Sequence, residues 1–172
     1  ITRQFFDRPG SLGGNALQPP DAGATAWALL DECARQIAEL AAAGWRVAVV
    51  HGNGPQVGEL LLQAEAVRRP ETLDVLDAET AGRLGYLLQQ RIGNHLRRLG
   101  CATAVVSLMT QVVVDPADPA FAVPTKPIGP FYPTLAGAQA VLPANAVVRE
   151  MAPGRWRRVV ASPRPLAVVE AA

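Results

Sequence analysis

The stretch that decides the fold of this chain is a glycine-rich turn with the sequence His51-Gly52-Asn53-Gly54-Pro55-Gln56-Val57-Gly58. The residues before it, Trp45–Val50, are short, apolar and β-branched, which predicts a buried parallel strand. Val57–Ala66 predicts a helix, and Pro55 suits a first helical position. A strand, a glycine turn and a helix N-terminus together bind anions, because free N–H groups and the helix dipole favour negative charge.

Two other interpretations of this turn stand beside the anion site. A tight strand-to-helix turn with no ligand has about even odds for two glycines alone. A dinucleotide fingerprint is disfavoured, because the spacing is G-x-G-x-x-x-G and no acidic residue closes a second strand about 20 residues later.

Length and composition limit the class of protein. The 172 residues are 49% hydrophobic with a net charge of +1, which predicts one globular domain, or one with a small appendage, and no nucleic-acid partner. Cys33 and Cys101 are expected to be small buried hydrophobes in a reducing cytoplasm. We expect no membrane partner, because no run reaches the roughly 18 apolar residues of a span. The chain starts at Ile1 rather than methionine, which suggests a piece of a longer protein, a pseudogene product or a mis-started frame.

A single lysine, Lys126, stands among the 16 basic residues, and the rest are arginine. Arginine does not replace lysine where a compact, mobile point charge is required. Lys126 is therefore a candidate for chemistry, with chance survival of one lysine as the alternative.

Helices alternate with apolar segments along the first two thirds of the chain. A second glycine turn, Ser11–Leu17, precedes a helix predicted over about Thr25–Ala43, which Gly44 ends. A long helix is predicted from Leu73 or Thr80 to Leu99. Strands are predicted at Ala102–Leu108 and Gln111–Val114. This alternation predicts an α/β fold with a mostly parallel sheet, and both glycine turns then fall at the carboxyl ends of strands, where ligands bind.

The character of the chain changes at Asp115, after which six prolines fall within residues 116–133. Prolines at this density are incompatible with core elements, so residues 115–158 are interpreted as an excursion from the sheet. It is predicted to hold a helix near Leu135–Val141 and a hairpin, Val147–Met151 with Arg155–Val160. The hairpin arginines 155, 157 and 158 are interpreted as a solvated face, with phosphate contact as the alternative. Leu166–Val169 predicts one more strand.

Six motifs then occur in the order typical of one enzyme family. They are Leu12–Leu17, the His51–Gly58 turn, Leu73–Leu76 with Gly85-Tyr86, Leu108–Asp115, Pro124–Phe131 and Trp156–Pro165. Each is weak alone, but in register they resemble the N-terminal portion of carbamate kinase, of the amino-acid-kinase superfamily. The resemblance covers nearly everything after Ser11.

The resemblance implies a three-layer α/β/α fold with a mostly parallel sheet, incomplete here. It divides the chain into a carbamate-binding half-domain (1–114), a small protruding subdomain that acts as a lid (115–158) and a return to the main sheet (159–172). The implied reaction is phosphoryl exchange between ATP with carbamate and ADP with carbamoyl phosphate, usually in arginine catabolism, by a cytoplasmic homodimer.

The implied site has two backbone loops and one cation. Gly13, Gly14 and Asn15, with Gly52, Asn53 and Gly54, would cradle carbamate and the transferred phosphoryl group. Lys126 would place positive charge at the equatorial oxygens. No residue of the chain is assigned as a metal ligand. ATP/ADP with Mg²⁺ is the implied cofactor, bound by a second half that family members have and this chain does not contain.

A further departure from the family lies at the start, where Phe5–Gly10 takes the place of an apolar central strand. The expectation is therefore a truncated enzyme that is inactive alone. Two alternatives remain: a non-catalytic remnant or interaction protein of the same fold, and another acyl-phosphate or phosphate kinase of the superfamily.

Overall fold

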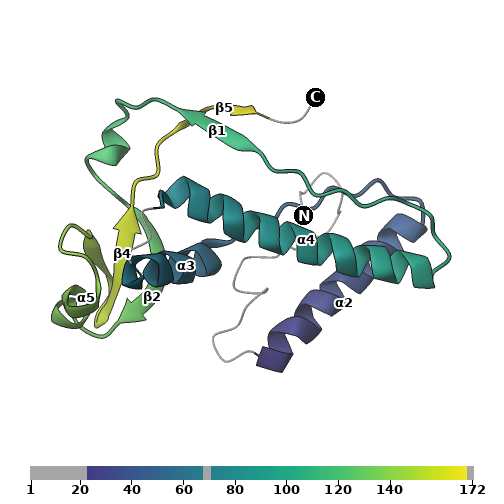
Figure 1. Ribbon diagram of the computed structural model, residues 1–172, viewed down its shortest axis with the longest axis horizontal. Helices are drawn as coiled ribbons and strands as arrows, with labels where there is room; N and C mark the ends of the chain where they lie inside the picture. Colours follow the sequence, from purple (N-terminus) through teal and green to yellow (C-terminus); the bar gives the residue numbers. More distant parts are fainter. Residues whose placement is uncertain (1–22, 68–70, 170–172) are drawn as a thin grey trace. The chain divides into compact units, whose positions relative to one another are not determined.

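The computed structural model describes residues 23–67 and 71–169 (Figure 1). These residues form two compact units. The first unit contains the described residues up to Asn53 together with Ala81–Ser107, and the second contains Gly54–Thr80 with the described residues from Leu108 onward. The boundary between the two units falls within the glycine turn, between Asn53 and Gly54.

The first unit is built on two helices that share one apolar cluster. Helix α2 (Gly23–Ala42) and helix α4 (Leu73–Arg98), whose C-terminal part lies in this unit, bury a stripe each. The cluster consists of Leu30, Ala34, Ile37, Ala38, Leu88, Ile92 and Leu96. Gly44 (φ 91°) and Gly100 (φ 69°) follow the two helix ends in the left-handed conformation that glycine tolerates. The two predicted helices are confirmed, and α4 begins at the earlier of its two predicted starts.

Two predicted strands of the first unit are wrong for the described residues. Trp45–Val50 and Ala102–Leu108 are irregular segments. Val47, Val49 and Val105 do pack against the helical cluster, which accounts for their apolar character. A strand also needs a hydrogen-bonded neighbour about 4.8 Å away, and no described residue forms a ladder with either segment.

The second unit centres on a three-stranded sheet that one helix covers. Strands β2 (Lys126–Tyr132), β4 (Arg155–Val160) and β3 (Val148–Ala152) lie in the order β2-β4-β3. Helix α3 (Gly54–Ala66) packs on β2, beside which it is drawn in Figure 1. Val57, Leu61 and Ala64 of α3 share a buried cluster with Leu76 and Ile128.

The predicted hairpin and its neighbouring helix are confirmed. Strands β3 and β4 pair in antiparallel fashion, and Gly154 has the positive φ (68°) that the tight turn requires. Helix α5 (Leu135–Val141) contacts all three strands of the sheet. Its N-terminus is capped by Thr134, whose hydroxyl oxygen accepts from the N–H of Gly137 at 3.0 Å.

Strand β2 was not predicted, because Pro127 and Pro130 lie within it. Proline has no N–H to donate and is tolerated on an edge strand, and β2 is an edge of its sheet. Its register with β4 shifts between Ile128 and Tyr132, around Gly129 with φ 70°. The strand therefore pairs at both ends and bends in the middle.

A second sheet in this unit is a two-stranded ribbon of β1 (Gln111–Val114) and β5 (Pro165–Val169). Both strands are predicted correctly, but they pair in antiparallel fashion. A short 3-10 helix, η1 (Pro119–Phe121), follows β1. Every ladder among the described residues is antiparallel. The α/β class is confirmed, whereas the parallel pairing expected of these segments is not seen in the described part of the chain.

Residues 115–158 contribute no strand to the β1–β5 ribbon. They form the β2-β4-β3 sheet with α5, and β4 continues to Val160. The division at 114/115 and 158/159 stays a prediction.

Candidate functional site

The glycine turn His51–Gly58 has free space around two of its glycines, Gly52 and Gly54. Gly54 is the first residue of α3, and Gly52 and Asn53 precede it without regular structure. A Cβ added to Gly52 or Gly54 would meet no atom within 4 Å. Neither glycine is among those with positive φ. Among the described residues, neither packing nor backbone conformation requires glycine at these two positions, and glycine leaves the backbone open to close approach.

The start of α3 gives this turn its chemistry. The first N–H groups of a helix have no partner within the helix, and the helix dipole adds partial positive charge there. Pro55, in the first turn, has no N–H and so removes only a donor that the helix would not have used. The start of α3 therefore presents backbone donors and partial positive charge at Gly54. The second predicted loop, Gly13, Gly14 and Asn15, lies outside the described residues.

Lys126 is the first residue of β2, and its side chain is exposed. It lies opposite Val160 of β4, and the preceding N–H, that of Thr125, donates to the carbonyl of Val160 at 3.1 Å. Because α3 packs on β2, Gly54 and Lys126 begin two elements that are held together in one unit.

Two glycines, Gly58 and Gly129, bring the backbones of α3 and β2 into direct contact. A Cβ on Gly58 would lie 2.2 Å from the N and 2.4 Å from the Cα of Gly129, so only glycine fits at this point of α3. Gly58 lies one helical turn, about 6 Å of rise, from Gly54. Gly129 lies three strand residues, about 10 Å, from Lys126. The Gly58–Gly129 contact thus sets the position of α3 relative to β2, and with it the positions of Gly54 and Lys126 at the starts of these elements.

A polar cluster holds β4 to the same helix. Arg158 donates from Nη1 to Oε1 of Glu65 at 2.7 Å, and the two side chains are 17% and 25% exposed. Tyr132 lies close enough for both charges to act on it, and burial raises the pKa of its hydroxyl. Tyr132 Oη and Glu65 Oε2 are buried with no hydrogen-bond partner among the described residues. Arg158 therefore does not belong to the solvated face predicted for it.

His51, in the first unit, is half-buried beside the helix that carries the Gly85-Tyr86 motif. A Cβ on Gly85 would lie 2.2 Å from Ser107 Oγ and 3.9 Å from His51 Nε2. Glycine at this position lets Ser107 and His51 approach α4. Burial lowers the pKa of the His51 imidazole, although a hydrogen bond with the Gly52 backbone opposes the shift. His51 Nδ1 is buried without a partner in the described part of the chain. Burial thus disfavours the charged form of this ring, which begins the glycine turn.

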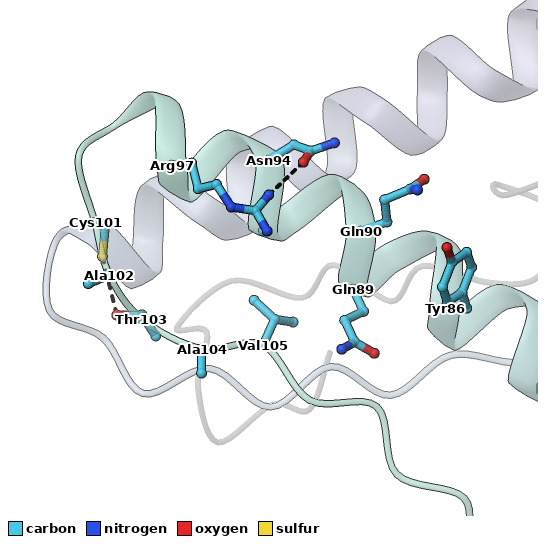
Figure 2. A pocket seen from close by; sticks show the side chains of 11 residues that line it. Tyr86, Gln89, Gln90, Asn94, Arg97, Cys101, Ala102, Thr103, Ala104 and Val105 are labelled. Carbon is cyan, nitrogen blue, oxygen red and sulfur yellow. Dashed lines mark hydrogen bonds between the residues drawn. The ribbon is translucent and has the colours of Figure 1, made fainter.

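A pocket of about 670 Å³ in the first unit contains none of the predicted site residues. Figure 2 shows it between the polar face of α4 and the segment 101–105. Arg97 donates to Asn94 at 2.8 Å, and Cys101 Sγ lies 3.2 Å from Thr103 Oγ1. The hydrogen bond with Thr103 lowers the pKa of the Cys101 thiol. Cys101 is therefore not the fully buried hydrophobe predicted, although it contacts the core cluster.

The described residues form neither a metal-binding cluster nor a membrane-spanning helix. They contain no group of three or more His, Cys, Asp or Glu side chains placed to hold a cation. The side chains in this part of the chain thus do not fit a protein-bound Mg²⁺. None of the helices described is long and apolar enough to cross a bilayer.

Residues 11–158 match the profile of the amino acid kinase family, and the chain belongs to that family. Its similarity to carbamate kinases is high. The carbamate kinase of Pyrococcus furiosus is 43% identical over 169 residues, which cover 94% of this chain and 54% of that protein. Carbamate kinase 1 of Enterococcus faecium is 44% identical over 166 residues, covering 94% and 53%.

Solved structures agree with the sequence comparison. Carbamate kinase from Giardia lamblia bound to AMP-PNP matches with a TM-score of 0.71 and 38% identity, covering 91% of this chain and 52% of that one. An Aeropyrum pernix protein matches with a TM-score of 0.76 and 36% identity, also covering 91% and 52%. The chain spans about half the length of the relatives it matches. The α/β class and the resemblance to carbamate kinase are confirmed.

Proposed function

We propose that this chain supplies the carbamate-binding part of a carbamate kinase-type phosphotransferase. The reaction is ATP with carbamate to ADP with carbamoyl phosphate, and its reverse, as part of arginine catabolism in the cytoplasm. The observation that carries the proposal is the glycine turn at the start of α3, where neither packing against the described residues nor φ accounts for Gly52 and Gly54. The carbamate kinases at 43–44% identity indicate which anion the turn would bind.

In the proposed reaction a carbamate oxygen attacks the γ-phosphorus of ATP. The new O–P bond forms as the bond from the γ-phosphorus to the β–γ bridging oxygen breaks, and ADP leaves with that electron pair. Such transfer depends on positioning and on neutralising charge at the transferred group. Backbone N–H groups at Gly52–Gly54, with those of Gly13–Asn15, would hold carbamate and the phosphoryl group. The ammonium group of Lys126 would stabilise the equatorial oxygens.

The remaining parts of the proposal rest on the relatives. One of them is a carbamate kinase bound to AMP-PNP, an ATP analogue. ATP/ADP is therefore the proposed nucleotide, and it would be bound mainly by a half that this chain does not contain. Residues 115–158 are proposed as a lid over the acceptor site, and a homodimer as the assembly.

An amide titration tests the anion site in the chain itself. Carbamoyl phosphate added to ¹⁵N-labelled protein is expected to shift the Gly52, Asn53 and Gly54 amides with one saturating curve. Because the two loops are proposed to share one anion, the amides of Gly13, Gly14 and Asn15 are expected to shift along the same binding curve. The amides of Gly44 and Gly100, which follow helix C-termini, serve as matched glycine controls and stay in place.

Two variants sharpen this test. Gly54→Ala puts a methyl group into open space, so the fold is retained while the approach of the anion is blocked. Its affinity is expected to fall roughly tenfold or more, as for loss of a hydrogen bond to a charged group. Gly93→Ala, equally open and on α4, is the control. Unchanged affinity in Gly54→Ala, or movement of one loop without the other, would contradict the proposed site.

A further inference from the structure

Three arginines gather on one face of the β2-β4-β3 sheet. Arg155 and Arg157 are two residues apart on β4, so they share a face. The aromatic ring of Phe131, from β2, lies under both, with guanidinium carbons 4.0 Å and 4.9 Å from the ring centroid. Arg149 of β3 is the cross-strand partner of Arg157 and lies on that face too. We call Arg149, Arg155, Arg157 and Phe131 the arginine face.

The positive charge on this face forms no ion pair with the other described residues. Like charges directly opposite one another destabilise a strand pair, yet Arg149 and Arg157 occupy such positions. Among the described residues, ion pairs form at Arg35, Arg91, His95 and Arg158 and not at the arginine face. The adjacent carboxylate, Glu150, pairs with Trp156 in the ladder and accepts from the N–H of Gly154 at 3.0 Å.

Two of the guanidinium groups are held in place before any ligand binds. Arg157 donates from Nε to the carbonyl of Gly129 at 2.7 Å, which leaves its terminal N–H groups available. Stacking on Phe131 adds a cation–π contact to both Arg155 and Arg157. Burial, and secondarily the nearby charge of Arg155, lowers the pKa of Arg157. The fold thus maintains a repulsive cluster in a fixed arrangement, at a cost that a bound anion would offset.

We propose that the arginine face is a binding site for a small phosphate-bearing anion, separate from the glycine turn. A planar guanidinium fork matches the oxygens of a phosphate group and binds them through paired, charge-assisted hydrogen bonds. Three forks on adjacent strands match a ligand with more than one phosphate group. A bound anion would also act on Gly129, because Arg157 donates to the Gly129 carbonyl. Gly129 lies three residues after Lys126 on the same strand.

Inorganic pyrophosphate is the probe, and the arginine Nε–H resonances of the ¹⁵N-labelled chain are the readout. Saturating shifts are expected at Arg149, Arg155 and Arg157. Arg155→Gln, a change at an exposed residue, is expected to weaken pyrophosphate binding about tenfold. Phe131→Leu keeps an apolar side chain, removes the stacking surface and is expected to weaken binding as well. Pyrophosphate should raise the melting temperature of the wild type more than that of Arg155→Gln.

Arg164→Gln is the matched control, because Arg164 is an exposed arginine of the same unit outside the sheet. Equal weakening by Arg155→Gln and Arg164→Gln, or shifts that never saturate at constant ionic strength, would overturn the proposal. The Gly52–Gly54 amides are read in a parallel backbone spectrum of the same sample. Pyrophosphate shifts at the arginine face, with carbamoyl phosphate failing at the glycine turn, would support this site and contradict the proposed function. Carbamoyl phosphate shifts at the glycine turn, with no pyrophosphate shifts at the arginine face, would support the proposed function and contradict this site.

Discussion

Gly58 of α3 and Gly129 of β2 meet backbone to backbone, and a Cβ on Gly58 would lie only 2.2 Å from the Gly129 nitrogen. The atoms nearest to such a Cβ are the backbone N and Cα of Gly129, so no flexible side chain could move to make room for it. The carbonyl of Gly129 is in addition the acceptor for Arg157. The position of the strand that begins at Lys126 therefore depends on the absence of one methyl group on α3.

Gly58→Ala is expected to destabilise the chain by about 1–3 kcal/mol, the usual cost of overpacking. Gly93→Ala on α4 is the control, since its Cβ would meet nothing within 4 Å. That variant is expected to gain about 0.5–1 kcal/mol from helix propensity. Urea unfolding followed by circular dichroism measures both. A Gly58→Ala protein as stable as the wild type would contradict the backbone contact.

Arg158→Met is expected to cost about 1–3 kcal/mol, because it leaves the partly buried Glu65 carboxylate without its partner. The double variant Arg158→Met/Glu65→Leu should recover much of that loss, since no lone charge then remains. The exposed pair Arg35–Glu32 is the comparison, and Arg35→Met should cost much less than Arg158→Met, because solvent screens an exposed pair. Equal losses at Arg158 and Arg35 would show that burial of the first pair is unimportant.

Stability is expected to fall below about pH 6.5, the ordinary pKa of histidine, because burial lowers the pKa of His51 in the folded state. Above pH 6.5 the ring is neutral in both states and there is no penalty. As the pH falls from about 6.5 toward the lower pKa of the folded state, the unfolded chain binds a proton that the folded chain does not, and stability is lost at up to about 1.4 kcal/mol per pH unit until the folded ring is protonated too. The chain has two histidines, so their imidazole NMR signals report this titration. A His51→Asn variant should lose that part of the pH dependence, and an unchanged slope would refute the assignment.

For Lys126 the expected effect is on turnover. In a complete carbamate kinase, methionine at the position of Lys126 should lower kcat by about 10²–10³, as when one charge-stabilising contact is removed. Nucleotide affinity should hardly change, because the charge is proposed to act at the transferred phosphoryl group. Steady-state kinetics with ADP and carbamoyl phosphate separate kcat from KM. An arginine variant tests charge without the compact ammonium group, and near-normal turnover with methionine would remove Lys126 from the mechanism.

The 172-residue polypeptide alone is expected not to transfer phosphate at the rate of a complete enzyme. It spans 54% of the Pyrococcus furiosus carbamate kinase, and loss of acceptor–nucleotide alignment removes about 7–11 kcal/mol of catalytic advantage. A coupled assay of ATP formation, with a complete enzyme as the control, measures this. Turnover within tenfold of the control would overturn the expectation.

The helices and the hairpin of this protein were predictable because their signals are local. The apolar spacing of α2 and α4 and the glycines after them need no knowledge of the rest of the fold. Pro153 and Gly154 likewise mark the β3–β4 turn within the sequence.

What could not be predicted depends on partners distant in sequence. The prolines of β2 argued against a strand, because proline is tolerated only at a sheet edge. Which strand is an edge depends on the whole sheet and cannot be read from one segment. Trp45–Val50 has the composition of a strand, but composition does not supply a neighbour to pair with. At the candidate sites, the sequence grouped Arg158 with Arg155 and Arg157, whereas alternation along β4 turns it toward Glu65 and brings in Arg149 from β3. The sequence signal that could have separated them is the two-residue period of the strand.

The β1–β5 ribbon has a consequence for the behaviour of the protein at high concentration. Val112, Val113, Leu166, Val168 and Val169 are each between 45% and 64% exposed. Two strands alone are marginally stable in water, and strand edges with free N–H and C=O groups act as templates for other chains. Among the described residues, we therefore expect this ribbon to be a site at which another chain can pair. A lysine at Val113 or Val168 would act as a gatekeeper charge that slows nucleation while the rest of the fold stays as it is.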